Sequence, residues 1–211
     1  MVGKGWSGLN KKTIVILVSG RGTNLQAIID ATQSNVIPGK ISLVISDIPE
    51  AYALVRAQKA NIPTLVLDYK SFSGKKEYET QLLKVLEKED PSVICLAGYM
   101  RILGKTIVNR FHRKILNIHP SLLPAFPGLE AQKQALDYGV KVSGCTVHFI
   151  DEGMDTGPII LQVPVIVRET DTVETLSQSI LEKEHEIYVK AIKLFLEQKL
   201  LVTGRIVRVK E

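Results

Sequence analysis

The chain has 211 residues, of which 45% are hydrophobic and 23% charged, with a formal net charge of +5. This length and composition predict one globular domain with a buried core. The longest apolar stretches are too short to span a bilayer, and residues 1–12 contain no apolar signal core, which argues against a membrane protein and against secretion. The basic residues are scattered rather than interleaved with aromatic residues, so nucleic-acid binding is only a weak hypothesis.

Strands and helices alternate in the first half of the chain. Residues 13–19 form a largely β-branched apolar run, which is typical of a strand buried on both faces of a parallel sheet. A helical pattern follows, with Leu25, Ile28 and Ile29 on one side. This alternation predicts an α/β fold with a doubly wound, mostly parallel sheet. The remaining predicted elements of this half are strands at 41–46, 64–67 and 93–97 and helices at 51–60 and 75–89.

The second half of the chain changes character. A short strand ends at a proline, and a loop with three prolines follows it. Two later segments alternate between apolar and polar residues, which predicts paired strands that extend the sheet in antiparallel fashion. In order, the predicted elements are a strand at 115–119, a helix at about 129–138, strands at 144–150 and 159–167, a helix capped by Asp171 or Thr172 and ending near 198, and a strand at 206–209.

Two cysteines occur, Cys95 and Cys145, both within apolar sequence. This placement predicts buried, reduced thiols that pack as small hydrophobic side chains. Two cysteines without a CxxC pair supply neither a disulfide framework nor a zinc site.

The loop after the first predicted strand carries the first chemical signal. It reads Ser19-Gly20-Arg21-Gly22-Thr23-Asn24 and leads into a helix. In doubly wound sheets ligands bind beyond the carboxyl ends of the strands, where a helix N-terminus offers free N–H groups and a partial positive charge. The loop lacks the third glycine of a dinucleotide fingerprint and the Gly-Lys-Ser/Thr of a P-loop. Taken alone, it fits an anion-binding loop and a plain tight turn equally well.

Asn117 and His119 form the second signal, at the end of the strand that runs into the proline loop. Because side chains alternate along a strand, both project to the same face. An amide donor beside an imidazole suits a developing oxyanion, and the imidazole can also move a proton. A strand end with satisfied polar groups is the simpler interpretation of such a pair. Its position at the ligand edge, next to a proline-stiffened loop, favours the catalytic hypothesis.

The third signal is the acidic, glycine-rich loop at 151–158. Such a loop is compatible with a solvated turn, but Asp155 is also able to reach back to His119. A nearby carboxylate favours the imidazolium form and is expected to raise the pKa of His119 toward the working pH. None of the other histidines is assigned to catalysis. His148 is interpreted as a core or edge residue, His112 as a surface residue, and His185 as part of a solvated helix face, with ligand contact as the second interpretation.

With these three signals in order, the chain resembles the glycinamide ribonucleotide formyltransferases from about Lys12 to Gly204. The stretches that carry the resemblance are SGRGTNLQAIID, LAGYMRIL, LNIHPSLLPAFPGL and VHFIDEGMDTGPIILQ. The resemblance implies one formyltransferase domain over residues 1–211 with a Rossmann-like fold. The small, polar and basic composition of residues 1–12 predicts a flexible N-terminal extension. The resemblance also implies formyl-transfer residues Asn117, His119 and Asp155, a substrate-phosphate loop of Gly22, Thr23 and Asn24, and a ribose contact from Glu184. The implied folate-binding residues are Lys75, Met100, Arg101, Ile102, Leu103, Asn117, Asp151, Glu152, Gly153 and Met154. Lys75 replaces an arginine of some members, which keeps the charge but loses the bidentate fork.

The function implied by the resemblance is transfer of the formyl group of 10-formyltetrahydrofolate to the amine of glycinamide ribonucleotide, in purine biosynthesis. Asn117 and protonated His119 would stabilise the oxyanion of the tetrahedral intermediate, and Asp155 would keep His119 charged and oriented. The implied enzyme needs no metal, acts on two small molecules in the cytoplasm without nucleic acid or membrane, and is a monomer or a homodimer.

Three alternatives remain at this point. A formyltetrahydrofolate deformylase would use water as acceptor, but usually carries an additional N-terminal domain, for which twelve residues before the first strand leave no room. A methionyl-tRNA formyltransferase would carry a further C-terminal RNA-binding domain, for which we expect no room after Glu211, and this argues against that alternative. A non-catalytic nucleotide-binding module would use the glycine loop, but would leave Asn117, His119 and Asp155 unexplained.

Overall fold

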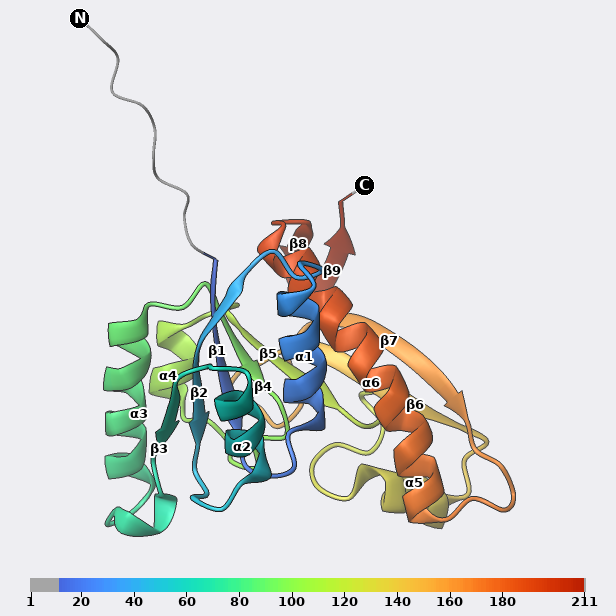
Figure 1. Cartoon of the computed structure of the whole chain (residues 1–211). Coiled ribbons are helices and arrows are strands. Elements are labelled where there is room, and N and C mark those ends of the chain that lie inside the picture. The colour runs from blue at the N-terminus through green and yellow to red at the C-terminus, as the bar shows by residue number, and fades with distance from the viewer. Residues whose placement is uncertain (1–11, 211) are drawn as a thin grey trace, which may run out of the picture.

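The computed structural model describes residues 12–210 and is built around one seven-stranded sheet (Figure 1). The strand order is β3-β2-β1-β4-β5-β6-β7. The first five strands of this order run parallel, and β6 and β7 continue the sheet in antiparallel pairing. The bounds are β1 Thr13–Val18, β2 Lys40–Ser46, β3 Thr64–Val66, β4 Val93–Leu96, β5 Ile115–His119, β6 Val142–Phe149 and β7 Ile159–Ile166. The predicted fold class, with its antiparallel extension, is confirmed. The predicted N-terminal extension lies, except for Lys12, outside the described residues.

Helices cover both faces of the sheet, with α1, α2 and α6 on one face and α3 and α4 on the other (Figure 1). The central strand shows why: after Thr13, every residue of β1 is fully buried. Ile14, Ile16 and Val18 belong to the core on the α1 and α6 side, and Val15 and Leu17 to the core on the α3 side. The helices are α1 Thr23–Gln33, α2 Tyr52–Lys59, α3 Lys75–Glu89, α4 Lys105–Arg110, α5 Ala131–Tyr138 and α6 Val173–Leu196.

Three short elements escaped prediction: the 3-10 helix Tyr69–Ser71, α4 and the strand β8 Leu200–Thr203, which pairs with β9 Ile206–Val209. Each is too short for a period to emerge from its sequence. The start of α6 resolves the choice of cap, because the Thr172 hydroxyl accepts a hydrogen bond from the N–H of Thr175. Asp171 supports this cap by accepting from the Thr175 hydroxyl.

Cys95 and Cys145 are both buried and unbonded, as predicted. Burial raises the pKa of each thiol to about 12, so neither is a ready nucleophile. None of the helices in residues 12–210 combines the length and apolarity needed to cross a membrane.

The carboxyl ends of β1, β4 and β5 lie at the same edge of the sheet, because these neighbouring strands are parallel. The segments that leave this edge are the glycine loop, the stretch with Met100–Leu103 and the proline loop (Figure 1). The strand order reverses direction at β1, with β2 on one side and β4 on the other. Such a switch point is where doubly wound sheets bind ligands.

Candidate functional site

The glycine loop forms the N-terminus of α1. Gly22 is the cap residue in the left-handed region, at φ 72°, and no side chain caps the helix. A β-carbon added to Gly22 would lie 2.6 Å from the β-carbon of Ala53, so both the backbone conformation and the close contact require glycine. The first N–H groups of α1 have no acceptor within the helix. The loop is therefore suited to bind an anion.

Asn24 points from α1 to α6, where its amide donates a 2.8 Å hydrogen bond to Glu184. Both side chains are buried, and burial raises the pKa of Glu184 to about 7. The Asn24 side-chain oxygen is buried without a partner in the described structure. The predicted phosphate-binding and ribose-binding residues thus lie in direct contact. His185 follows Glu184 and has a buried Nε2 without a partner there, which differs from the solvated helix face predicted for it.

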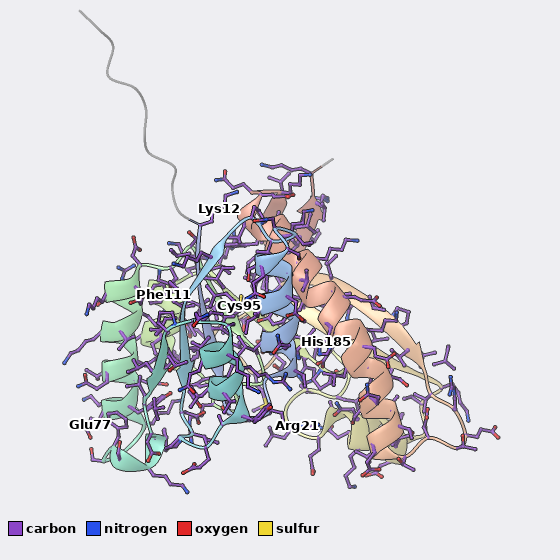
Figure 2. The ribbon with its side chains drawn as sticks, in the orientation of Figure 1. Lys12, Arg21, Glu77, Cys95, Phe111 and His185 are labelled. Carbon is purple, nitrogen blue, oxygen red and sulfur yellow. The ribbon has the colours of Figure 1, made fainter. Side chains whose placement is uncertain are left out.

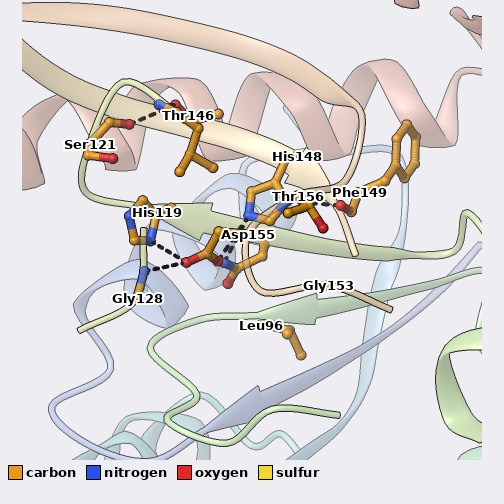
Figure 3. A network of polar contacts seen from close by, with 12 residues as sticks. Leu96, His119, Ser121, Gly128, Thr146, His148, Phe149, Gly153, Asp155 and Thr156 are labelled. Carbon is orange, nitrogen blue, oxygen red and sulfur yellow. Dashed lines mark hydrogen bonds and ion pairs between the residues drawn. The ribbon is translucent and has the colours of Figure 1, made fainter. Parts of the chain in front are cut away.

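His119 ends β5 and is almost entirely buried. Its Nε2 lies 2.9 Å from the carbonyl oxygen of Phe126. Its Nδ1 lies 3.5 Å from Oδ2 of Asp155 (Figure 3). Because both ring nitrogens face oxygen acceptors, the contacts suit the doubly protonated ring. Burial nevertheless lowers the pKa of His119, and the Phe126 carbonyl and Asp155 only partly oppose this effect. Asp155 therefore acts in the expected direction and raises this pKa, but the desolvation of the ring is the larger influence, so the pKa lies below its usual value.

Asp155 connects two histidines and the proline loop. Its Oδ1 lies 3.6 Å from Nε2 of His148, and its Oδ2 accepts a 2.8 Å hydrogen bond from the N–H of Gly128 (Figure 3). Burial raises the pKa of Asp155, but the contacts with His148, Gly128 and His119 outweigh burial, so the pKa lies below its usual value. These contacts therefore favour the ionised form of Asp155. The predicted proximity of Asp155 to His119 is confirmed.

His148 is a site residue that the sequence did not reveal. It is fully buried, and its Nε2 lies 3.2 Å from the side-chain amide nitrogen of Asn117. This contact follows from the antiparallel register of β5 and β6, in which Asn117 is directly opposite His148. The Nδ1 of His148 lies 2.9 Å from the carbonyl oxygen of Phe149. In the tautomer with the proton on Nδ1, Nδ1–H donates to that carbonyl and Nε2 accepts an N–H of Asn117; in the form that carries a proton on Nε2, this proton faces Asp155 instead.

A buried hydroxyl fixes the proline loop to the sheet. Thr146 of β6 donates to the carbonyl of Ser121, at 2.7 Å (Figure 3). It accepts from the N–H of Leu123, at 3.1 Å. Gln162 of β7 donates to the same hydroxyl and to the Leu123 carbonyl. These bonds hold the segment that follows His119 in one conformation.

Arg101 lies at the β4 end of the same edge. Its Nε donates to Asp47 at 2.5 Å, and its guanidinium lies 3.5 Å from the ring centroid of Tyr69. Oδ1 of Asp47 is buried and has no hydrogen-bond partner in residues 12–210. The sequence did not indicate this cluster, because Asp47 and Tyr69 are both far from Arg101 in the chain.

A hollow of about 240 Å³ lies beside Arg101. It is lined by Lys75 and the stretch Met100–Leu103, for which folate binding stays a prediction. Lys75 itself lies 3.6 Å from Oε1 of Glu79, a carboxylate that also accepts from the N–H of Gly104. Met100 and Ile102 are exposed, whereas Leu103 is buried. The hollow thus combines exposed apolar side chains with two cationic side chains, Lys75 and Arg101, each of which is paired with a carboxylate.

The loop Asp151 to Met154 does not line this hollow. Asp151 accepts hydrogen bonds from the N–H of Gly153 and the hydroxyl of Thr156, which shape the turn. Glu152 forms a 2.7 Å ion pair with Lys105 on α4. Met154 is half-exposed and lies next to Gly128. The loop therefore lies against the His119 and Asp155 side of the site.

Comparisons with known proteins show which family the chain is similar to. The family model described as formyl transferase matches residues 12–192. A phosphoribosylglycinamide formyltransferase from Bacillus subtilis (strain 168) is 42% identical over 185 residues, which cover 88% of this chain and 95% of the relative. The crystal structure of glycinamide ribonucleotide transformylase 1 from Symbiobacterium toebii has a TM-score of 0.93 and 49% identity, covering 97% of this chain and 100% of the other. A trifunctional purine biosynthetic protein adenosine-3 from Drosophila melanogaster is 42% identical over 198 residues, and the chain spans 15% of its length.

Proposed function

Because the chain belongs to the formyl transferase family, we propose that it transfers the formyl group of 10-formyltetrahydrofolate to the amine of 5'-phosphoribosylglycinamide. The products are 5'-phosphoribosyl-N-formylglycinamide and tetrahydrofolate. Residues 12–210 act as one formyltransferase domain in this proposal, and the enzyme works in the cytoplasm as a monomer or homodimer.

The observation that carries the proposal is the Asn117, His119, His148 and Asp155 cluster at the ligand edge of the sheet. An amide donor and an imidazole, with a carboxylate behind the imidazole, are the groups that stabilise an oxyanion and relay a proton. The anion-binding end of α1 lies at the same edge, and the hollow beside Arg101 follows β4. This arrangement supports a phosphorylated acceptor on one side and a folate on the other.

The proposed reaction begins when the glycinamide amine attacks the formyl carbon. The developing oxyanion accepts a hydrogen bond from Asn117 Nδ2, whose other N–H is donated to His148. Protonated His119 stabilises the same oxygen electrostatically. Asp155 balances the charge of His119 while the amine proton passes to the departing folate nitrogen. The C–N bond to the acceptor forms, the C–N bond to folate breaks, and no electrons are exchanged with another reagent.

An absorbance assay of folate release, with and without glycinamide ribonucleotide, tests the proposal. Release is expected only when the ribonucleotide is present, and His119→Ala is expected to lower kcat on the order of 10²–10³-fold. His112→Ala, at an exposed position, is the matched control and should leave the rate unchanged. Release that does not depend on the ribonucleotide would identify water as the acceptor and replace the transferase with a deformylase.

A further inference from the structure

The glycine loop contacts the first two turns of α2. The N–H of Ala53 donates a 3.0 Å hydrogen bond to the carbonyl of Gly20. One residue further, Nε of Arg56 donates a 2.9 Å hydrogen bond to the carbonyl of Arg21. Ala53 also packs so closely on Gly22 that no β-carbon fits there. The two carbonyls that precede Gly22 are thus both fixed by α2, while the first N–H groups of α1 have no acceptor within the helix.

Arg56 brings a positive charge to this loop. It is half-buried, its Nη1 donates to the Gln26 side chain at 3.2 Å, and its guanidinium lies 5.0 Å from the Tyr52 ring centroid. Within residues 12–210, no carboxylate oxygen lies within 4.0 Å of its guanidinium nitrogens. The charge of Arg56 is therefore not neutralised by a direct ion pair. The carbonyl that Arg56 contacts belongs to Arg21, the residue before the left-handed Gly22. Figure 2 labels Arg21, whose carbonyl Arg56 holds, at the edge of the molecule.

We propose that Arg56 is a positioning residue of the phosphate subsite. Its Nε holds the Arg21 carbonyl, so that the loop keeps the conformation that presents the N–H groups of α1. Its charge adds to the partial positive charge of the helix terminus and favours a phosphate dianion. This inference rests on the proposed function, because it takes the 5'-phosphate of the acceptor as the anion.

The test compares Arg56→Met with Arg205→Met, which removes the same charge from the exposed turn between β8 and β9. In Arg56→Met, the KM for glycinamide ribonucleotide should rise about tenfold, which corresponds to the loss of one charge-assisted contact. The kcat and the KM for formyl-folate should stay at the wild-type values. The inhibition constant of inorganic phosphate, measured as a competitor of the ribonucleotide, should rise by the same factor. Arg205→Met should change none of these quantities.

Arg56→Lys keeps the charge but loses the planar guanidinium group. Its KM for the ribonucleotide and its inhibition constant for inorganic phosphate should therefore lie between those of the wild type and Arg56→Met. Thermal unfolding of each variant separates a loss of fold from a loss of phosphate binding. An unchanged KM for the ribonucleotide, or a raised KM with an unchanged phosphate inhibition constant, would overturn the role of Arg56. If inorganic phosphate does not compete with the ribonucleotide in the wild type, the loop is not the phosphate site and the underlying assignment fails instead.

Discussion

His119 and Asp155 face each other in the site, with Nδ1 of the imidazole 3.5 Å from Oδ2 of the carboxylate. Burial lowers the pKa of His119, and Asp155 is one of the groups that oppose this effect. In the proposed mechanism the ring acts as an imidazolium. The carboxylate therefore increases the fraction of the active form at a given pH, against the larger effect of burial, and contacts the ring through Nδ1.

The pH dependence of Asp155→Asn tests this relationship. If catalysis requires protonated His119, wild-type kcat/KM falls as pH rises through a pKa below 6.5. Asp155→Asn removes a group that raises this pKa, so the falling limb should move to lower pH. The measurement is a profile of kcat/KM from about pH 5 to pH 9, with the exposed Asp137→Asn as control. A limb that stays in place would show that Asp155 does not control the titration.

His148 is expected to position Asn117. His148→Phe fills the same space but removes the 3.2 Å contact with the amide, so Asn117 is free to rotate. The kcat should fall about tenfold, the equivalent of one hydrogen bond, with both KM values unchanged. His148→Gln can still accept from Asn117 and should recover most of the rate. Steady-state kinetics of both variants test the positioning role of His148. An equal loss of kcat in His148→Phe and His148→Gln would mean that His148 only fills the core.

Glu184→Gln is expected to stabilise the fold while weakening substrate binding. Burial raises the pKa of Glu184 to about 7, so ionisation opposes folding increasingly as pH rises from 4.5 to 7. Gln does not titrate, and the gain in unfolding free energy should reach about 3 kcal/mol above this window and vanish below it. Urea unfolding at about pH 4 and pH 8 measures the difference, with the exposed Glu182→Gln as control. The KM for the ribonucleotide should rise, because a neutral amide is a weaker acceptor for ribose hydroxyls.

Thr146→Val tests the attachment of the proline loop. The substitution keeps the shape of the side chain and removes a hydroxyl that bonds to Ser121, Leu123 and Gln162. Leaving these buried backbone groups unsatisfied should cost about 1–3 kcal/mol of unfolding free energy and lower kcat. Thr80→Val, which removes an exposed hydroxyl bond on α3, is the control. Denaturant unfolding and kinetics that match the wild type would show that the loop is held by other contacts.

The regular elements were predictable because their signals are local. The apolar run of β1 and the glycine loop after it fix the strand, the turn and the helix within one stretch of sequence. By contrast, α4 and β8 are too short for periodicity to identify them. The packing of α4 depends on core residues that are distant in sequence, whereas β8 pairs with β9, which follows it across a short turn.

The site was predictable only in part. Asn117 and His119 could be joined by strand alternation, but the contact with His148 depends on the register of β5 against β6. A register between strands of distant sequence is a tertiary property. The Arg101 and Asp47 pair and the Arg56 contact with the glycine loop have the same origin, since each joins residues that follow different strands.

The Gly128 N–H donates to Oδ2 of Asp155, so the strength of this backbone hydrogen bond depends on the charge of that carboxylate. Protonating the carboxylate, or drawing it toward a ligand, weakens the acceptor and releases this amide to solvent. The hydrogen-exchange rate of Gly128 therefore reports the charge of Asp155 from a loop that need not touch either substrate.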